Sequence, residues 1–276
     1  MSDPRRTCAV LVPSCEAYSD LWTPFFTLFF RHWPRCPWPV FLGSDGGTFQ
    51  HDRVRFLTCP PGLPWSDCVI TYLRQIEAKW VLFCLEDFFL RRDVAPGRLE
   101  QCCDQIEALD GTCLRLVRRP PPARRDVLPA DASLGVLPPG AAYRVSTQAA
   151  IWRRDHLLRL LQPGESAWQF ETQASLRSDA LFPGGFFGVY RDVFPYRHHV
   201  VERGQWFPWE ARRFGRMNIG CDFGRRAIMP PRAASLWLLG KAKDVSLAPL
   251  PESVRARLRH VFNAGKNLFY RDGRIK

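Results

Sequence analysis

The sequence predicts an α/β fold in which a mixed, mainly parallel, Rossmann-like sheet is flanked by helices. Short apolar runs alternate with helix-like segments through the first half of the chain, as in sheets whose strands are joined by crossover helices. The run WVLFCL, from Trp80 to Leu85, is apolar throughout, which is typical of a strand buried on both faces. Two carboxylates, Glu86 and Asp87, follow it directly. Ligands of open α/β sheets bind beyond the carboxyl ends of strands, so these carboxylates mark a candidate site.

The segments before this central strand predict the order β-α-β-β-α-β. We expect strands at Cys8 to Val12, within Pro39 to Gly47, and at Val54 to Cys59. Ser19 or Asp20 can cap a first helix that runs to about Trp33, provided that Pro24 falls in its first turn. A second helix is predicted from Pro64 onward, because apolar residues then recur at helical spacing, at Val69, Ile70, Leu73 and Ile76.

The segments after the carboxylates predict further helices and strands around an irregular insertion. A helix is expected from Pro96 to Leu109 and a strand over Leu114 to Val117. Arg118 to Gly140 is rich in proline and arginine, so we expect an irregular loop or linker there. One or two strands within Ala142 to Trp152, a helix over Arg154 to Leu161, and a helix that begins at Ser166 complete the prediction. We place a main domain at residues 1–202 and a basic C-terminal extension at residues 203–276.

Composition restricts the class of protein. With 276 residues, 46% of them hydrophobic, the chain can form a substantial core. The apolar run from Leu21 to Phe30 ends at Arg31, too short for a membrane span, and Val10 to Val12 is too short for a signal peptide. Ten cysteines are scattered without a CxxC pair or a Cys/His cluster, which argues against a zinc site and indicates a reducing cytoplasm.

The net charge of +12 lies almost entirely in the last quarter. Residues 203–276 contain 16 Lys and Arg against 5 Asp and Glu, a net charge of +11. Such a segment can bind nucleic acid, an anionic membrane or a phosphate-bearing ligand, or it can be a solvated basic surface. Charge alone does not distinguish these readings.

Three segments in order resemble a known family. SCEAYSDLWTPFFTLFFRHWP, LEDFFL and STQAAIWRRDHLLRLLQPGESAWQFE are similar to sugar transferases of bacterial polysaccharide gene clusters, over roughly Cys8 to Trp206. The resemblance implies the GT-A glycosyltransferase fold and hexosyltransferase-like activity on a nucleotide-diphosphate sugar. It makes LEDFFL the acidic motif that holds a divalent cation, Mg²⁺ or Mn²⁺, and the donor diphosphate. Relatives carry a basic residue near Trp206, where this chain has Gln205, so a phosphate role at that position is not expected.

Glycosyl transfer needs a neutralised diphosphate and, when the anomeric centre is inverted, a base for the acceptor hydroxyl. We assign the metal to Asp87, with Glu86 assisting or contacting the donor, and His198 or His199 completing the site. Glu171 is the predicted base, since the resemblance places WQFE on the acceptor side; it is equally explained as a helix-dipole acid. Donor contacts are expected from residues at strand ends and helix starts, namely Pro13, Ser14, Glu16, Tyr18, Asp45, Trp65 and Ser66. Acceptor contacts are assigned to Trp168 and Gln148.

Other functions are less well supported by the sequence. His51 and His156 have no ligand partners at metal spacing, and GxSxG, GxGxxG and P-loop motifs are absent from the sequence. Aromatic residues and arginines interleave from Arg203 to Arg226, which suits stacking on nucleic-acid bases or a membrane interface. A sugar nucleotidyltransferase would use the same metal and phosphate groups. We expect a cytoplasmic, membrane-peripheral glycosyltransferase with a glycan or lipid-linked acceptor, and no nucleic-acid partner.

Overall fold

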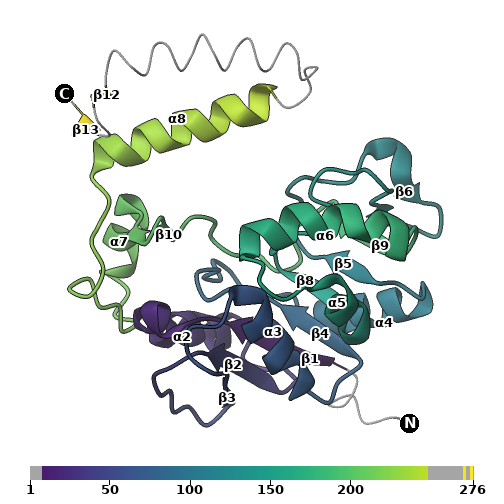
Figure 1. Cartoon of the computed structure of the whole chain (residues 1–276), viewed down its shortest axis with the longest axis horizontal. Helices are drawn as coiled ribbons and strands as arrows, with labels where there is room; N and C mark the ends of the chain where they lie inside the picture. The colour runs from purple at the N-terminus through teal and green to yellow at the C-terminus, as the bar shows by residue number, and fades with distance from the viewer. Residues whose placement is uncertain (1–7, 248–269, 272–273, 276) are drawn as a thin grey trace.

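A nine-stranded mixed sheet forms the centre of the computed structural model, which describes residues 8–247, 270–271 and 274–275 (Figure 1). Its order is β3-β2-β1-β4-β8-β5-β9-β7-β6. Seven strands share one direction, and β8 and β7 run against them. The predicted mixed, mainly parallel sheet is therefore confirmed. The strands are β1 (Cys8–Pro13), β2 (Val40–Ser44), β3 (Val54–Thr58), β4 (Trp80–Phe83), β5 (Cys113–Arg115), β6 (Val127–Leu128), β7 (Asp131–Val136), β8 (Ala150–Arg153) and β9 (Phe186–Val189).

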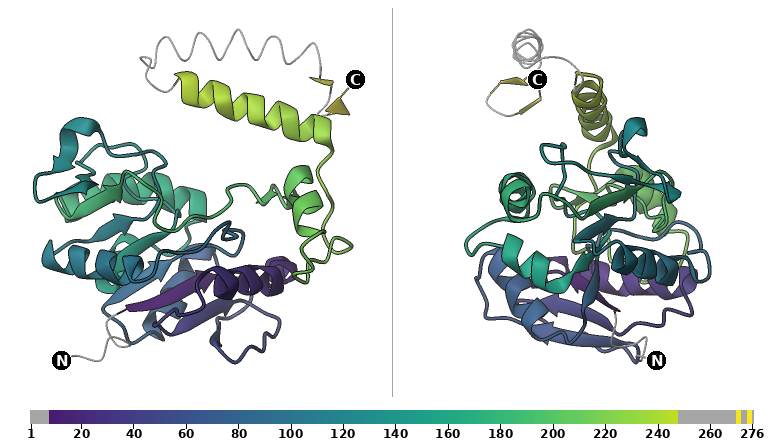
Figure 2. Two further views of the ribbon diagram at one scale, coloured as in Figure 1. Left: turned by 180° about the vertical axis from the view of Figure 1, so that it is seen from behind. Right: turned by 90° about the vertical axis from the view of Figure 1, so that its right-hand side faces the viewer.

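Helices cover both faces of this sheet. The right-hand view of Figure 2 shows α2 (Trp22–His32) and α4 (Arg98–Ala108) on one face, and α3 (Trp65–Arg74), α5 (Arg154–Leu160) and α6 (Ala167–Leu181) on the other. Successive strand side chains point to opposite faces, so Val10 packs with the first pair of helices and Leu11 with the second group. This double burial explains why the strand sequences are apolar without alternation.

The connections reverse direction between β1 and β4. From β1 the chain moves outward to β2 and β3, and α3 then returns it to β4 on the other side of β1. The region beyond the carboxyl ends of β1 and β4, which we call the crevice, is therefore the switch point of the sheet, the usual ligand position in α/β sheets. The loop after β1 contains η1 (Glu16–Leu21), and the loop after β4 contains Glu86 and Asp87.

Most predicted elements before residue 115 are confirmed within a few residues, but the helix start is wrong. Neither Ser19 nor Asp20 caps α2; both lie in η1, and α2 begins at Trp22, with Pro24 in its first turn as expected. The Asp20 side chain is instead buried in an ion pair. That pairing explains why a residue with good capping propensity lies outside the cap position.

The predicted irregular insertion at residues 118–140 is partly wrong. It contains η2 (Arg124–Asp126) and the strands β6 and β7, and β7 pairs with β9 at the edge of the main sheet. β9 was not predicted from the sequence. Of the strands expected within Ala142 to Trp152, the structure contains β8, at Ala150–Arg153. β7 has three exposed or partly exposed residues before Leu134, so its sequence lacks the apolar run that identifies inner strands.

Part of the predicted C-terminal extension packs on the sheet domain. It contains β11 (Gln205–Trp206), which pairs with β10 (Val201–Glu202), then α7 (Pro208–Phe214) and α8 (Pro231–Leu247), followed by β12 (Tyr270–Arg271) and β13 (Arg274–Ile275). Trp206 is fully buried, with its ring 6.1 Å from that of Phe89. Figure 1 shows α8 beyond α7, away from the sheet. The proposed division at residue 202 remains a prediction, and much of the basic tail lies outside the described residues.

Candidate functional site

The two carboxylates occupy a tight turn at the end of β4. The main-chain N–H of Phe88 donates to the oxygen of Leu85 at 3.1 Å, which places Glu86 and Asp87 at the central positions of the turn. Glu86 is buried and Asp87 is half-buried. Asp87 Oδ1 is excluded from solvent and accepts no hydrogen bond within the described chain. A buried carboxylate oxygen without a partner is costly, so this oxygen is suited to a bound ligand.

The residues after the turn hold it against the C-terminal half. The Phe88 ring stacks on that of Tyr196, with 4.1 Å between centroids and 12° between planes. Leu90 and Tyr196 also pair as an isolated antiparallel bridge. Both rings are buried, so the stack fixes the main chain that carries Asp87.

Burial raises the pKa of both carboxylates. The pKa of Glu86 rises to about 8, through burial and the neighbouring charge of Asp87, while Arg226 opposes the rise. The pKa of Asp87 rises to about 7, through burial and the charge of Glu202, opposed by His199 and Arg226. A divalent cation would favour the ionised forms, because it replaces the hydration that burial removes. Strongly shifted acids in a crevice are typical of functional sites.

Arg226 was not predicted as a site residue, yet it connects the basic quarter to the crevice. Its guanidinium donates to both carboxylate oxygens of Asp20, at 3.0 and 2.9 Å, and to the main-chain oxygen of Ala17 at 2.7 Å. It also lies over the ring of Tyr18, 4.3 Å from the centroid. Arg226 therefore fixes η1 beside the acidic turn. In the sequence, Arg226 is one of several arginines that interleave with aromatic residues from Arg203 onward, and nothing else there indicates that it holds η1.

The histidine pair divides between two environments. The charge of His199 acts on Asp87, and His199 Nδ1 lies 3.3 Å from Glu202 Oε2. His198 instead packs on Tyr196, and burial, with Arg119 and His199, lowers its pKa to about 4. The described residues contain no group of three His, Cys, Asp or Glu side chains arranged to hold a metal ion. Mg²⁺ is usually held by one or two protein carboxylates, with water and phosphate oxygens as its other ligands. Asp87 could bind Mg²⁺ in this way without further protein ligands.

The residues predicted to bind the donor after β1 and β2 lie together. Asp45 Oδ1 accepts from the Glu16 N–H at 2.8 Å, and Ser14 Oγ accepts from Trp22 Nε1 at 2.8 Å. Pro13 ends β1, and Ser14 N–H donates to the oxygen of Gly43 on β2. The pKa of Tyr18 is raised by burial and by the charges of Glu86 and Asp87, with Arg226 opposing them. These residues border the crevice, and their donor contacts remain predictions.

Trp65 and Ser66 have structural partners on α6 and the loop before it. The Trp65 ring lies 5.4 Å from that of Phe170 and 6.2 Å from that of Phe83. Ser66 is fully buried, and its hydroxyl accepts from the Glu165 N–H at 3.0 Å. The structure thus gives both residues a packing role at the start of α3, and a donor contact from them remains untested.

Glu171 lies in the first half of α6, apart from the acidic turn. Its Oε1 accepts from both the N–H and the hydroxyl of Thr147, at 2.7 and 2.9 Å, while Oε2 has no hydrogen-bond donor in the described chain. Next to Thr147, Gln148 accepts a hydrogen bond from the hydroxyl of Tyr196. A short path of contacts therefore links the proposed base to the ring that supports Asp87. Trp168 is 72% exposed on α6, where an acceptor can reach it.

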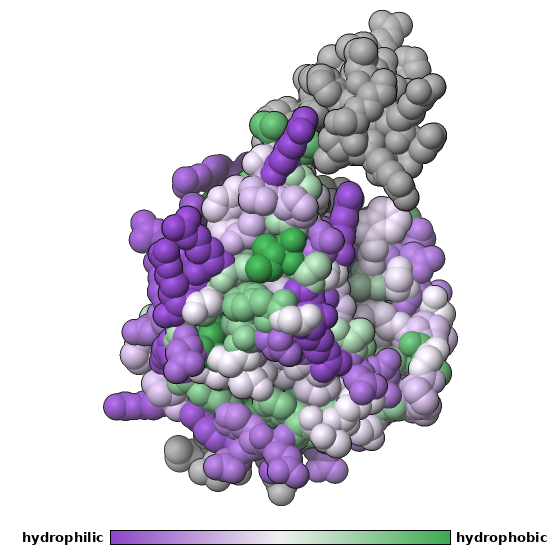
Figure 3. Space-filling view, turned by 90° about the vertical axis from the view of Figure 1, so that its left-hand side faces the viewer, coloured by the Kyte–Doolittle hydropathy of each residue, from purple (hydrophilic) through white to green (hydrophobic). Residues whose placement is uncertain are grey.

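The aromatic residues of the basic quarter are largely used in packing. Trp206, Phe207 and Phe214 are buried, and Phe223 packs partly against the same core; Trp209 is 47% exposed. Figure 3 shows hydrophilic residues around a small apolar patch on the face that forms the left-hand side of Figure 1. No helix in the described ranges is long and apolar enough to cross a bilayer. Most of these rings are therefore not available to stack on nucleic-acid bases, the alternative use of this segment.

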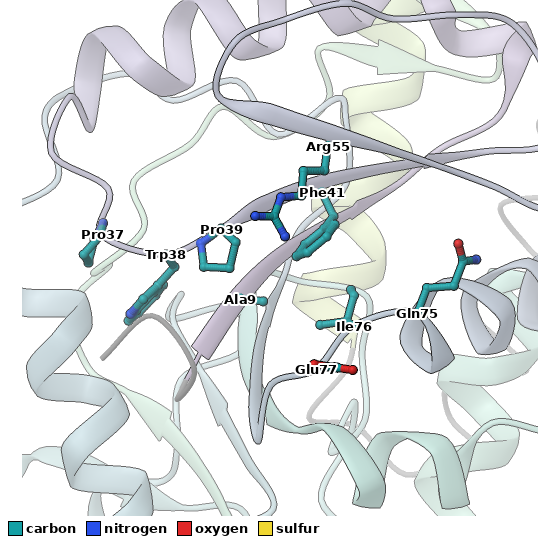
Figure 4. Close-up of a pocket in the computed structure, with 9 residues that line it drawn as sticks. All are labelled: Ala9, Pro37, Trp38, Pro39, Phe41, Arg55, Gln75, Ile76 and Glu77. Atoms are coloured by element: carbon teal, nitrogen blue, oxygen red, sulfur yellow. The ribbon is translucent and has the colours of Figure 1, made fainter. Parts of the chain in front are cut away.

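A separate cavity of about 560 Å³ lies at the opposite edge of the sheet, near the amino ends of β1 to β4 (Figure 4). Trp38, Phe41, Arg55 and Gln75 are among the residues that line it. In Figure 4 the aromatic rings and the guanidinium surround an open centre, and no acidic pair faces it. This cavity is therefore distinct from the crevice beside Asp87.

Neither a protein-family model nor a curated protein sequence matches the chain. Similar solved structures include the mannosyltransferase PcManGT from Pyrobaculum calidifontis in complex with GDP-Man and Mn²⁺, at 17% identity and a TM-score of 0.46, covering 95% of this chain and 81% of that one. A fragment of S. aureus TarS is similar at 13% identity and a TM-score of 0.45, covering 69% of this chain. The match spans 59% of that fragment. We assign no residue role from these similarities.

Proposed function

We propose that the chain is a glycosyltransferase that binds a nucleotide-diphosphate sugar in the crevice between β1 and β4. The observation that carries this proposal is the acidic turn: Asp87 has a buried, unpartnered oxygen at the topological switch point of the sheet. Such a position suits a cation and a diphosphate. The resemblance of LEDFFL to the acidic motif of sugar transferases supports the same assignment.

Each group of the site has a role in this reaction. Asp87 holds Mg²⁺ or Mn²⁺, with Glu86 and His199 beside it, and the loop from Pro13 to Tyr18 with Asp45 contacts the nucleotide. When bound, the cation neutralises charge on the leaving diphosphate. Arg226 positions the loop through Asp20.

Glu171 takes the proton from the acceptor hydroxyl if the anomeric centre is inverted. The two hydrogen bonds from Thr147 orient its carboxylate and leave Oε2 for the acceptor. The acceptor, a glycan or lipid-linked sugar, lies between Gln148 and Trp168 in this proposal. Cytoplasmic location at the inner face of a membrane is part of the same hypothesis.

A thermal-shift panel tests the donor site. UDP, GDP, CDP, TDP and their common sugars are compared with and without Mn²⁺ on the wild type, Asp87→Asn and the control Asp67→Asn. A ligand at 100 times its Kd stabilises the folded state by about 2.7 kcal/mol, which is readily measured. We expect one nucleotide class to stabilise the wild type and the control, with Mn²⁺, but not Asp87→Asn. A flat panel on folded protein would refute the proposal.

A further inference from the structure

Arg115, at the end of β5, is a buried arginine whose charge is not balanced. It is 2% exposed, yet its Nε and Nη2 have no hydrogen-bond partner in the described chain. Of the three guanidinium nitrogens, Nη1 makes a hydrogen bond within the described chain, to the main-chain oxygen of Tyr143 at 3.2 Å. No carboxylate forms an ion pair with it among the described residues. An uncompensated buried charge is strongly unfavourable, so this side chain requires an explanation.

Arg144 shows what a structural buried arginine looks like in the same molecule. Its Nε donates to Leu137 O, its Nη1 to the Ser178 hydroxyl, and its Nη2 to Phe182 O, at 3.0, 2.8 and 2.8 Å. Asp179 also lies 3.4 Å from Nη1 and balances the charge. Every nitrogen of Arg144 is therefore satisfied by protein atoms, whereas two of the three in Arg115 are not.

The two unsatisfied nitrogens of Arg115 form one edge of the guanidinium. Nε–H and the adjacent Nη2–H are parallel donors whose spacing matches the two oxygens of a carboxylate or phosphate. A neutral hydrogen-bond acceptor would satisfy one donor and leave the charge, while a bidentate oxyanion satisfies both donors and the charge. Burial lowers the pKa of Arg115, while Cys113 and Tyr196 oppose the shift.

The position of Arg115 points to the acceptor rather than the donor. β8 lies between β4 and β5, so the ends of β4 and β5 are separated by roughly 10 Å, two strand spacings. The crevice between β1 and β4 lies on the other side of β4. Tyr196 is electrostatically coupled to both groups, because the charge of Asp87 raises the pKa of Tyr196 and Tyr196 opposes the lowering of the pKa of Arg115.

We propose that Arg115 binds an oxyanion, phosphate or carboxylate, carried by the acceptor substrate. This inference rests on the glycosyltransferase function proposed above. Tyr143 holds the other side of the guanidinium, because its main-chain oxygen accepts from Nη1, and the residue is 58% exposed. Its main chain is also left-handed, with φ 54°, which is a strained conformation for tyrosine.

The test uses inorganic phosphate, methyl phosphate and glucuronate as probes, with sodium chloride at matched ionic strength. Melting temperature is measured for the wild type, Arg115→Met, Arg115→Lys and the control Arg55→Met, an exposed strand arginine. We expect at least one oxyanion to raise the melting temperature of the wild type and the control, but not of Arg115→Met. Arg115→Lys retains charge without the parallel donors and should lose most of the effect. Glucuronate and methyl phosphate distinguish a sugar carboxylate from a phosphate ester.

A second measurement separates binding from packing. The ¹⁵Nε resonance of Arg115 should shift as the effective anion is added, and chloride should leave it in place. In sodium chloride alone, Arg115→Met should melt above the wild type, because it removes an unbalanced buried charge. A lower melting temperature for Arg115→Met together with no anion response in the wild type would overturn the proposal and make Arg115 structural.

The donor panel is run on the same variants. If Arg115→Met loses the response to nucleoside diphosphate with Mn²⁺, Arg115 belongs to the donor site and the acceptor assignment fails. If no variant responds to any nucleotide, the proposed function fails, while the anion response of Arg115 is still measured. The two failures are therefore distinguishable.

Discussion

Arg226 and Asp20 form a two-point ion pair although 206 positions separate them in the chain. Both side chains are almost completely buried, and the pair lies beside the acidic turn of Glu86 and Asp87. The loop after the first strand is therefore held in place by a residue from the last quarter. Through this ion pair, the basic segment around Arg226 contributes directly to the structure of the candidate site.

Replacement of Arg226 by alanine should destabilise the protein strongly. The substitution leaves the Asp20 carboxylate buried and unpaired, and breaking a buried ion pair in this way costs about 3–5 kcal/mol. Urea unfolding at pH 7 measures the loss. The neighbouring Arg225→Ala serves as the control, because Arg225 is exposed and its side chain donates to the main-chain oxygen of Glu16 at 3.2 Å. Equal unfolding midpoints for the two variants would show that the ion pair does not stabilise the fold.

Stability should fall as pH rises through the titration of the acidic turn. The folded-state pKa values of Glu86 and Asp87 are raised to about 8 and about 7, above their ordinary values. The folded state thus binds these protons more tightly than the unfolded state does. The protonated carboxyls therefore contribute their full stabilisation of the folded state below about pH 4, and this contribution is lost as the pH approaches 8.

Urea midpoints between pH 5 and pH 8.5 measure this dependence, and the double variant Glu86→Gln, Asp87→Asn isolates it from the histidines. We expect the wild type to lose more stability than the double variant across this range. If the urea midpoints of the two proteins changed equally with pH, neither carboxyl would titrate between pH 5 and pH 8.5. Mn²⁺ should bind the wild type more tightly at pH 8 than at pH 6, because binding needs the ionised carboxylates.

Substitution of Glu171 by glutamine should remove general-base catalysis without loss of folding. The amide oxygen can still accept both hydrogen bonds from Thr147. We expect turnover with the donor identified in the nucleotide panel to fall about 100- to 10,000-fold, with unchanged donor binding. Glu165→Gln is a control on the same helix start, since Glu165 pairs with Arg177. Wild-type turnover in Glu171→Gln would eliminate Glu171 as the base.

The cysteines should differ in reactivity toward a thiol reagent such as Ellman's reagent. Seven of the ten are buried, and Cys15, Cys36 and Cys221 are half-buried. Burial raises the pKa of Cys36 and of Cys221 to about 12, more than that of Cys15, so Cys15 should react first. Labelling followed by peptide mass spectrometry identifies the sites, with urea-unfolded protein as the reference. Rapid labelling of Cys84 or Cys113 in native protein would contradict the buried core.

The sheet was predictable from the sequence wherever burial imposes a simple pattern. A strand covered on both faces must be apolar throughout, so the segments of β1, β2 and β4 are evident as runs. The acidic turn was evident for a related reason, because two carboxylates interrupt an apolar region. β7 was missed because it lies next to the short edge strand β6 and its first half is exposed or partly exposed, and the sequence of such a strand resembles that of a loop.

The site was only partly predictable, since its ion pairs join distant parts of the chain. Asp20 has the sequence features of a helix cap, and only its contact with Arg226 shows that the side chain is buried. Arg115 follows an apolar strand and cannot be distinguished by pattern from an exposed arginine. Its unsatisfied nitrogens are a property of the folded structure alone. Tertiary contacts of this kind have no local signature.

The ion pair of Asp20 and Arg226 also has a consequence for how the protein is made. At roughly 5–20 residues per second, a ribosome adds residue 226 about 10–40 seconds after residue 20. During that interval the nascent first half can form its early strands, but the Asp20 carboxylate has no partner. The crevice between β1 and β4 is therefore completed late in translation, after the aromatic segment around Trp206 has emerged from the ribosome.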